Sequence, residues 1–429
     1  MRDFRPWLVI VAVLLAHGGI TVFGINRINA CGFSRRWVKR IEKAILVSSV
    51  AIPMAIVRVD WEMLVPWIRQ GGWWPPSTRL FAWYGLWALA VGSILAIGWL
   101  ESRWWLIPPR HLLRQRGERI DVHARLAEGS FASRDARWLG KIPGNQVGEI
   151  ELNHKWLMLP RELPAAEGLR IAHLSDLHFT GQLRPEHYRF LLHQMQRHEP
   201  DLVILSGDVV DVDACLPWVE ELLGQLAAPW GCGFVLGNHE LRLSSIAPLV
   251  GCLRALGWMD LGARDYRLQA PTAKLTIELL GTERPWFERH HNASQETEVT
   301  RQVAPAASTL RIAVSHSPDQ IGWARRCHAD LMLAGHTHGG QIRIPGLGPI
   351  VAPSWFGSKF ASGVFYLPPT LMHVSRGVSG IHPLRFRCRP EVSLLTLTNH
   401  AQTGTDASEL LATADSRQGI AVRGAAVVS

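Results

Sequence analysis

The sequence contains six cysteines, but no two of them lie close together and there is no Cys-x-x-Cys motif. This scatter excludes a disulfide-stapled scaffold and a thiolate metal site. No internal repeat is visible, which excludes a repeat architecture. The first 25 residues have no convincing basic n-region and no convincing small-x-small cleavage site before Asn26, so a cleaved signal peptide is not expected.

The chain has 429 residues, a formal net charge of +9 and a pI near 9.6. Its length predicts two or more segments. A basic excess is typical of proteins that meet an acidic partner or an anionic surface. Much of this excess lies beside apolar N-terminal segments, where it indicates membrane topology instead. We find no specific signal for nucleic-acid binding.

Residues 1–107 are predicted to form a membrane region with two or three transmembrane helices, at about 7–25, 44–59 and 80–100. Leu80–Leu100 is the clearest span, because its 21 residues carry no charge and a bilayer core needs roughly 20 apolar residues. The middle segment is weaker. Ala44–Val57 has 14 largely apolar residues and contains Pro53, so it fits a span, a re-entrant segment or an interfacial one.

The number of spans decides which side of the membrane the rest of the chain occupies. With three spans, the basic loop between the first two shares a side with the chain after Glu101, and the positive-inside rule places that side in the cytoplasm. With two spans, the same rule places the large C-terminal region outside. We expect three spans, with the large C-terminal region in the cytoplasm.

The remainder divides into a connector with leading strands (108–164), a large C-terminal domain (165–398) and a disordered tail (399–429). The tail is predicted from its Ala-, Thr-, Ser- and Gly-rich composition without sustained periodicity. In the connector, 120–126 and 147–159 have the alternation of strands. From Leu169 onward, short apolar runs alternate with helical patterns and then give way to strands. This order predicts an α/β fold of layered sheets covered by helices.

Polar clusters follow five of the predicted strands, at the place where each strand ends. They are Asp176-x-His178, Gly207-Asp208-x-x-Asp211, Gly237-Asn238-His239-Glu240, His316, and Gly335-His336-x-His338. Each cluster alone also fits a strand-end turn or a cap. Five of them at the same relative position indicate one site, because ligands of open α/β sheets gather beyond the carboxyl ends of the strands.

The clusters contain imidazoles, carboxylates and one amide, with no thiolate. Such a set suits a pair of divalent metal ions, Mn²⁺, Fe or Zn²⁺, better than Ca²⁺ or an iron–sulfur cluster. Two cations at about 3.5–4 Å activate a shared water and clamp the oxygens of a phosphoryl group.

The order of these five motifs resembles the calcineurin-like metallophosphoesterases over roughly 169–397. The string Gly335-His-Thr-His-Gly-Gly-Gln-Ile-Arg-Ile-Pro345 is similar to the membrane-associated bacterial branch of that family. The resemblance implies a layered β-sandwich flanked by helices, here preceded by N-terminal transmembrane helices. It also implies a dinuclear metal centre at the sheet edge and a location in the bacterial inner membrane.

Carried over residue by residue, the resemblance assigns a role to each cluster. Asp176, His178 and His338 would hold one metal. Asn238, His316 and His336 would hold the other, and Asp208 would bridge the two. His239 would be catalytic without binding metal, and Asp211 would orient it.

The expected activity is that of a membrane-anchored phosphohydrolase in which a metal-bridging hydroxide cleaves a phosphoester or pyrophosphate bond. The family includes UDP-diacylglucosamine pyrophosphohydrolases, so this lipid is the specific substrate candidate, and the bilayer is an expected partner. Two alternatives stay open: a general phosphodiesterase for small soluble or nucleic-acid esters, and a non-catalytic membrane scaffold or sensor. An intact His239 and Asp211 disfavour the scaffold, because a pure binding site needs no general acid.

Overall fold

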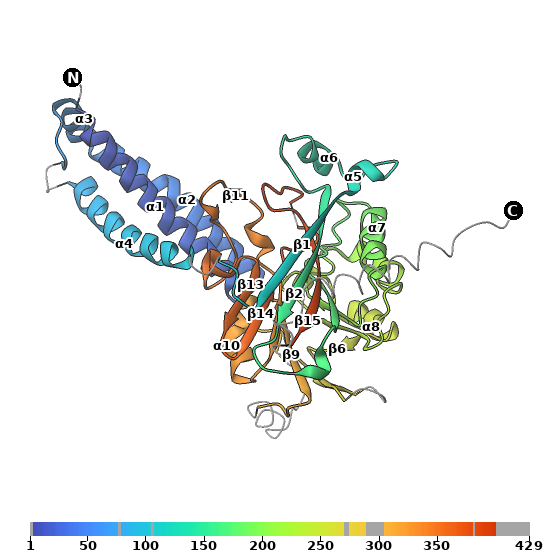
Figure 1. Cartoon of the computed structure of the whole chain (residues 1–429). Coiled ribbons are helices and arrows are strands. Elements are labelled where there is room, and N and C mark those ends of the chain that lie inside the picture. Colours follow the sequence, from blue (N-terminus) through green and yellow to red (C-terminus); the bar gives the residue numbers. More distant parts are fainter. Residues whose placement is uncertain are drawn as a thin grey trace.

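The structure is a computed structural model that describes residues 3–75, 79–103, 107–269, 274–288, 304–380 and 382–399. Most of the predicted tail, 400–429, lies outside these ranges. All six cysteines lie within them, and none of the six forms a disulfide bond. Figure 1 shows a helical arm, with the N-terminus and α3 at its far end, attached to a body of two sheets.

The arm consists of α1 (Arg5–Ala30), α2 (Arg35–Val59), α3 (Trp61–Gln70) and α4 (Leu80–Arg103). Of the described helices, α1 and α4 are long and apolar enough to cross a membrane. Helices α2 and α3 meet at 79° and qualify as a third span if the bent pair is counted as one. Helices α1 and α4 pack closely: a Cβ on Gly92 would lie 2.5 Å from the Cβ of Ala16, and small residues permit such approach between membrane helices.

Two sheets form the body. The seven-stranded sheet has the order β1-β2-β15-β3-β4-β5-β6, and the six-stranded sheet has the order β13-β14-β10-β9-β8-β7. The strands of the first sheet are β1 (Leu112–Asp121), β2 (Glu149–Met158), β15 (Glu391–Thr398), β3 (Arg170–Leu174), β4 (Leu202–Ser206), β5 (Cys232–Val235) and β6 (Met259–Asp260). Those of the second are β13 (Gly363–Leu367), β14 (Thr370–Val374), β10 (Leu331–Ala334), β9 (Thr309–Ser315), β8 (Thr276–Thr282) and β7 (Tyr266–Gln269). A small pair, β11 (Arg343–Ile344) and β12 (Gly348–Pro349), lies apart from both.

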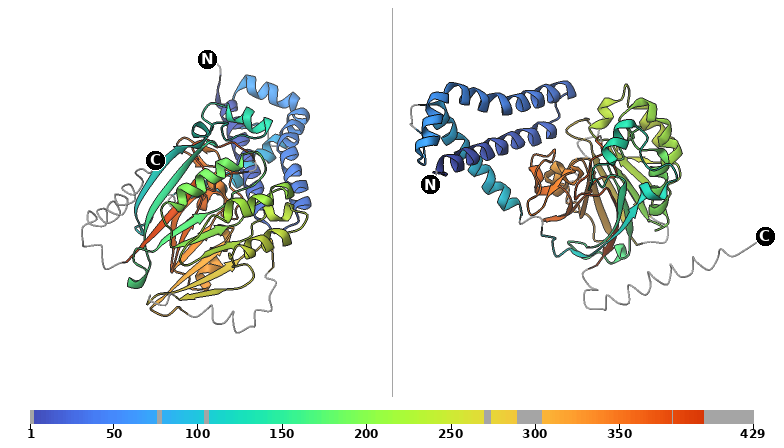
Figure 2. Two further views of the ribbon diagram at one scale, coloured as in Figure 1. Left: turned by 90° about the vertical axis from the view of Figure 1, so that its right-hand side faces the viewer. Right: turned by 90° about the horizontal axis from the view of Figure 1, so that it is seen from above.

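Helices cover the outer faces of the two sheets, as the two views in Figure 2 show. The first sheet is covered by α7 (Pro185–Gln196), α8 (Ala247–Ala255) and the π-helical turn η4 (Val219–Leu223), and the second by α10 (Ile321–Arg326). Along β3, Ile171 faces the second sheet, whereas Ala172 and Leu174 face the helices. Every residue of β4 is buried, because parallel strands inside such a layered fold are covered on both faces. The predicted α/β layered architecture is therefore confirmed.

One predicted strand is wrong. Ile120–Leu126 was expected to be extended, but β1 ends at Asp121 and a short helix, α5 (Val122–Arg125), follows. The carboxylate of Asp121 accepts a hydrogen bond from the backbone N–H of Ala124, and such a cap starts a helix at the end of the alternating pattern. Strands β1 and β2 pair with each other, and β2 pairs with β15. The leading strands thus belong to the same sheet as the residues after 165, and the division of the chain at residue 165 stays a prediction.

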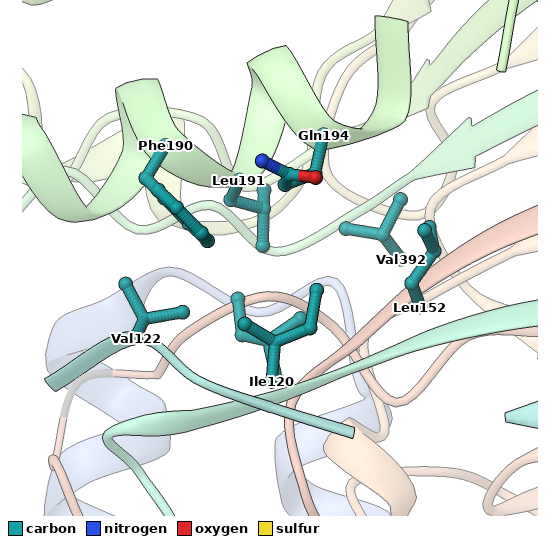
Figure 3. A pocket seen from close by; sticks show the side chains of 8 residues that line it. Ile120, Val122, Leu152, Phe190, Leu191, Gln194 and Val392 are labelled. Carbon is teal, nitrogen blue, oxygen red and sulfur yellow. The ribbon is translucent and has the colours of Figure 1, made fainter. Parts of the chain in front are cut away.

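A small cavity separates α7 from β1 and β2 (Figure 3). Phe190, Leu191 and Gln194 reach toward Ile120 and Leu152, and the space open to a water-sized sphere is about 10 Å³. A single water needs about this much room and also several polar partners. This space is a packing gap and lies away from the polar clusters.

A buried ionic network lies between β2, β15 and β14. Lys155 Nζ contacts a carboxylate oxygen of Glu391, and their side chains are 3% and 2% exposed. The same ammonium lies 2.8 Å from His373 Nε2, and the other Glu391 oxygen is 2.7 Å from Arg376 Nε. One carboxylate therefore balances two buried cations.

Replacing this carboxylate should destabilise the fold strongly. Glu391→Gln removes the carboxylate that contacts Lys155 and leaves Arg376 with Glu151, 3.2 Å away, and breaking a buried pair typically costs about 3–5 kcal/mol. The expected result is a large fall in the thermal unfolding midpoint of the full-length protein in detergent. Glu149→Gln is the control, because Glu149 pairs with the more exposed Arg119 and Arg389 and should cost about 1 kcal/mol or less. Equal midpoint shifts in the two variants would contradict this account.

Candidate metal centre

The five predicted polar clusters meet at one edge of the two sheets. Strands β3, β4 and β5 run parallel in the first sheet, and β9 and β10 run parallel in the second. Their carboxyl ends release the loops that carry Asp176, Asp208, Asn238, His316 and His336. The loops are joined by backbone hydrogen bonds, for example from Asp176 N–H to Gly207 O (3.0 Å) and from Gly335 N–H to His316 O (2.9 Å).

Glycine is needed where two of these loops approach each other. A Cβ on Gly237 would lie 2.2 Å from Asp208 Oδ1, and a Cβ on Gly335 would lie 1.7 Å from Ser175 Oγ and 2.5 Å from Asp176 Oδ2. Any side chain at either position would displace a predicted metal ligand. The two glycines therefore explain why the motifs read Gly-Asn and Gly-His.

The first group of ligands comprises Asp176, His178, Asp208 and His338, all buried. The Nε2 atoms of His178 and His338 face each other at 3.2 Å, and Asp176 Oδ1 lies 3.4 Å from His338 Nε2. Asp208 Oδ2 lies 3.6 Å from His178 Nε2. Two imidazole nitrogens and two carboxylate oxygens thus converge on one point, as the predicted first metal site requires.

The second group comprises Asp208, His316 and His336. Asp208 Oδ2 lies 3.1 Å from His316 Nε2, and His336 Nδ1 lies 3.2 Å from the same nitrogen. His316 Nδ1 is 2.7 Å from the carbonyl oxygen of Ser206, to which it donates, so its Nε2 is left to face the group. Asp208 belongs to both groups, which is the geometry expected of a bridging ligand.

One buried atom shows that the site fits a metal ion. Among the described residues, Asn238 Oδ1 is a buried acceptor without a hydrogen-bond partner. A buried polar atom left in this state costs about 1–3 kcal/mol. Asn238 was predicted from the sequence as a ligand of the second metal, and a cation supplies the partner that the protein does not.

Burial and charge set the protonation of these groups. Burial lowers the pKa of His336 and of His338 well below the usual range, which keeps both rings neutral, as metal ligands must be. For His316, burial acts in the same direction, but the negative charge of Asp208 outweighs it and raises the pKa to about 9. For Asp208, burial would raise the pKa, but His239 and His316 hold it well below its usual range. These shifts favour a positively charged His316 beside a negatively charged Asp208, where the two groups meet.

Backbone strain is concentrated in the same loops. Five of the seven predicted metal ligands have positive φ angles: Asp176 (54°), His178 (46°), Asp208 (55°), His336 (70°) and His338 (50°). Side-chain-bearing residues adopt this conformation at a cost of about 1–3 kcal/mol each, and such strain clusters at functional sites. At the three histidines these angles could not be predicted locally, because glycine, asparagine and aspartate are the residue types that usually adopt them.

Asp211 links the first group of ligands to His239. One of its carboxylate oxygens lies 2.7 Å from His178 Nδ1, and the other contacts His239 Nδ1. Arg242 Nη1 lies 2.7 Å from the second oxygen, and Arg242 Nη2 lies 3.3 Å from His239 Nε2. The expected contact between Asp211 and His239 is therefore present, and the contacts with His178 and Arg242 are additional. His239 Nε2 is 3.9 Å from Asp208 Oδ2, so this ring borders the metal centre.

Two positioning residues were not predicted from the sequence. Glu240 is buried and accepts hydrogen bonds from the backbone N–H groups of Val209 and Gly237, both at 2.6 Å, so it ties the Asp208 loop to the Asn238 loop. Arg385 is also buried and donates to His338 O at 2.9 Å. Glu240 lies inside a motif that was noted, but Arg385 lies in a loop before β15 with no local signal.

Trp286 closes one side of the second group. Its ring centroid lies 4.8 Å from that of His336 and 5.4 Å from that of His316. The preceding Pro285 touches the turn between α1 and α2, since a Cβ on Gly32 would lie 2.5 Å from Pro285 O. The end of the helical arm that joins the body is therefore connected to the metal centre through Pro285 and Trp286.

Comparisons with known proteins agree with this geometry. Residues 169–340 match the family described as calcineurin-like phosphoesterase. The chain is 28% identical over 239 residues to the uncharacterized metallophosphoesterase YkuE of Bacillus subtilis, covering 54% of this chain and 79% of that protein. It is 29% identical over 239 residues to the phosphodiesterase YaeI of Escherichia coli, covering 54% and 83%. It is 25% identical over 310 residues to the UDP-2,3-diacylglucosamine pyrophosphatase LpxG of Chlamydia trachomatis, covering 60% and 91%.

Proposed function

We propose that this protein acts at the membrane on a lipid-linked substrate. The premise is that the chain carries a calcineurin-like metallophosphoesterase domain and is a metal-dependent phosphoester hydrolase. The specific candidate is UDP-diacylglucosamine, whose pyrophosphate bond would be cleaved. The relative LpxG carries this activity in its name and aligns over 60% of the chain, beyond the matched domain alone.

One observation supports hydrolysis most directly. Two groups of buried Asp and His side chains share Asp208, and the buried Oδ1 of Asn238 has no hydrogen-bond partner among the described residues. We propose that Asp176, His178, Asp208 and His338 hold one ion and that Asp208, Asn238, His316 and His336 hold the other, with Mn²⁺, Fe or Zn²⁺ as candidates. When bound, such a pair lowers the pKa of a water and neutralises charge on a phosphoryl group.

A side chain of the protein, His239, would then protonate the leaving group. His239 borders the ligands without belonging to the two groups that share Asp208, and its Nδ1 is engaged by Asp211, so its Nε2 is the atom left to deliver a proton. Arg242 donates to that nitrogen in the absence of substrate. A phosphoryl oxygen would compete for this guanidinium and free Nε2, which would then take up the proton that the attacking water loses and pass it to the leaving oxygen.

The position of the site favours a substrate in the membrane. Pro285 and Trp286 place the second ligand group beside the turn that joins α1 and α2. Burial lowers the pKa of Arg242, and the positive charge of Arg35, the first residue of α2, lowers it further. A head group held near the bilayer surface would meet these residues before the metal centre.

The basic residues of the same helices suggest on which side of the membrane the catalytic body lies. The arm joins the body at the end of α1, the start of α2 and the end of α4 (Figures 1 and 2). This end carries the basic residues Arg27, Arg35, Arg36, Lys39, Arg40, Lys43 and Arg103. By the positive-inside rule, we propose a multi-pass protein of the inner membrane whose catalytic body is cytoplasmic.

The test compares substrates at equal metal concentration. The full-length protein in lipid nanodiscs should hydrolyse UDP-diacylglucosamine with a higher kcat/KM than a soluble chromogenic phosphodiester. The Asp208→Asn variant in the same nanodiscs corrects for contaminating hydrolases. Preference for the soluble ester would contradict the lipid substrate and favour the general phosphodiesterase that the name of YaeI suggests. Binding of the lipid without turnover would favour the scaffold.

A further inference from the structure

We propose that the segment 342–356, called here the interfacial loop, docks on the bilayer surface beside α1 and α4 and fixes the height of the metal centre above it. This inference concerns the attachment of the body to the membrane and does not depend on the identity of the substrate.

The interfacial loop exposes an unusual set of large apolar side chains. The exposed fractions range from 40% to 54% for Ile342, Ile344, Leu347, Val351, Trp355 and Phe356. Single exposed apolar residues are normal on a soluble surface, but a contiguous group marks a surface that contacts a partner or a membrane. The loop contains the small pair β11 and β12 and lies outside both sheets.

The loop is held at the ends of two helices that are long enough to span. Asn26 in the last turns of α1 is buried; its Nδ2 donates to Ile350 O at 3.3 Å, and its Oδ1 accepts from Ala352 N–H at 3.0 Å. Arg103, the last residue of α4, donates to Leu347 O at 2.7 Å and to Pro349 O at 3.3 Å. These hydrogen bonds therefore hold the interfacial loop at the ends of α1 and α4, where the two helices would leave the membrane.

The chemistry at this level fits the boundary between head groups and acyl chains. Arg27 lies in the last turn of α1, where arginine side chains reach the lipid phosphates. Trp355 and Phe356 are adjacent aromatic residues, and tryptophan is enriched at this boundary. The exposed apolar side chains of the interfacial loop lie at the ends of both helices. Contact with the bilayer explains this coincidence, whereas contact with a folded protein would not require it, so we assign the bilayer as the partner of the loop.

The loop is also tied to the metal-binding loops at both of its ends. Its first residue lies four positions after His338. Near its other end, Ser354 Oγ donates to Asp319 Oδ1 at 2.6 Å, and Trp355 N–H donates to Asp319 Oδ2 at 3.0 Å; Asp319 lies three positions after His316. The surface that meets the bilayer and the loops that carry three predicted ligands are thus one connected unit.

The test measures the depth of one loop residue in the membrane. A nitroxide label is placed on Trp355→Cys of the full-length protein in lipid nanodiscs, and its collision rates with oxygen and with a water-soluble nickel complex are compared. The matched control is Trp138→Cys, because Trp138 is 67% exposed on α6 (Arg134–Gly140), outside the loop. Wild-type protein treated with the same reagent gives the background from the native cysteines.

We expect the ratio of oxygen to nickel collisions to be several-fold higher at 355 than at 138. Equal ratios at the two positions would overturn the proposal. Protection of the label at 355 from both reagents, in nanodiscs and in detergent alike, would also overturn it, because a second copy of the chain or another protein would then cover the loop. A second variant, Trp355→Ser with Phe356→Ser, should retain hydrolysis of a soluble ester in detergent, which shows that it is folded, while a label on Leu347→Cys in this variant loses its high ratio.

Discussion

Asp208→Asn should lower metal-dependent hydrolysis by at least about 10³-fold, because the charge stabilisation that a metal pair supplies is several kcal/mol and each 1.36 kcal/mol is tenfold in rate. Asp208 is the one carboxylate shared by the two ligand groups. The substitution keeps the shape of the side chain but removes the negative charge that faces His178, His239 and His316. The measurement is kcat with a chromogenic phosphodiester, together with the metal content of the purified variant.

The matched control for this variant is Asp213→Asn, five residues along the same loop. Asp213 accepts a hydrogen bond from Ser244 Oγ at 2.9 Å and is exposed, so its loss should leave both rate and metal content nearly unchanged. Near-full activity of Asp208→Asn, with the fold intact by thermal unfolding, would contradict the bridging role.

His239→Gln should lower kcat by about 10²–10⁴-fold, the usual contribution of a general acid, while the metal content stays close to that of the wild type. The reason is the position of the ring, which is held by Asp211 and borders Asp208 outside the two groups that share this carboxylate. A general acid matters most for a poor leaving group. The loss should therefore be large for an alkyl ester and much smaller for an activated aryl ester.

The leaving-group comparison separates chemistry from damage to the site. An equal loss for alkyl and aryl esters, or a fall in metal content, would show that His239 is a structural or metal-binding residue instead. Arg242→Lys is an informative partner variant, because it keeps a positive charge near Asp211 but loses the second nitrogen that contacts His239 Nε2. It should reduce the rate less than His239→Gln.

The convergence of the predicted ligands could be inferred from the sequence because each of them follows a strand. Asp176, Asp208 and Asn238 stand directly beyond buried parallel strands of one sheet, and His316 and His336 beyond two of the other. Their convergence follows from the topology once the strands are recognised. The strands were recognised because runs such as Leu202–Ser206 are apolar and bounded by polar turns.

Features that depend on tertiary contacts were not predictable in the same way. Arg385 contacts His338 from a loop 47 residues away along the chain, and no local sequence pattern predicts that contact. The helix that replaced the predicted strand at Ile120–Leu126 depends on one cap by Asp121, which competes with an alternating pattern. The interfacial loop has no hydrophobic periodicity from which it could have been predicted. Its proposed contact with the bilayer depends on its position, which is set by tertiary contacts with Asn26 and Arg103.

The central claim is that two metal ions bound by these loops carry the activity. The most direct measurement is a titration of the chelator-treated full-length protein with Mn²⁺, Zn²⁺ or Fe²⁺, in which bound metal and the rate of phosphodiester hydrolysis are followed together. Our account predicts that activity is lost on chelation and returns as about two ions per chain are bound. Full activity in the metal-free protein, or saturation of the rate with a single bound ion per chain, would contradict it.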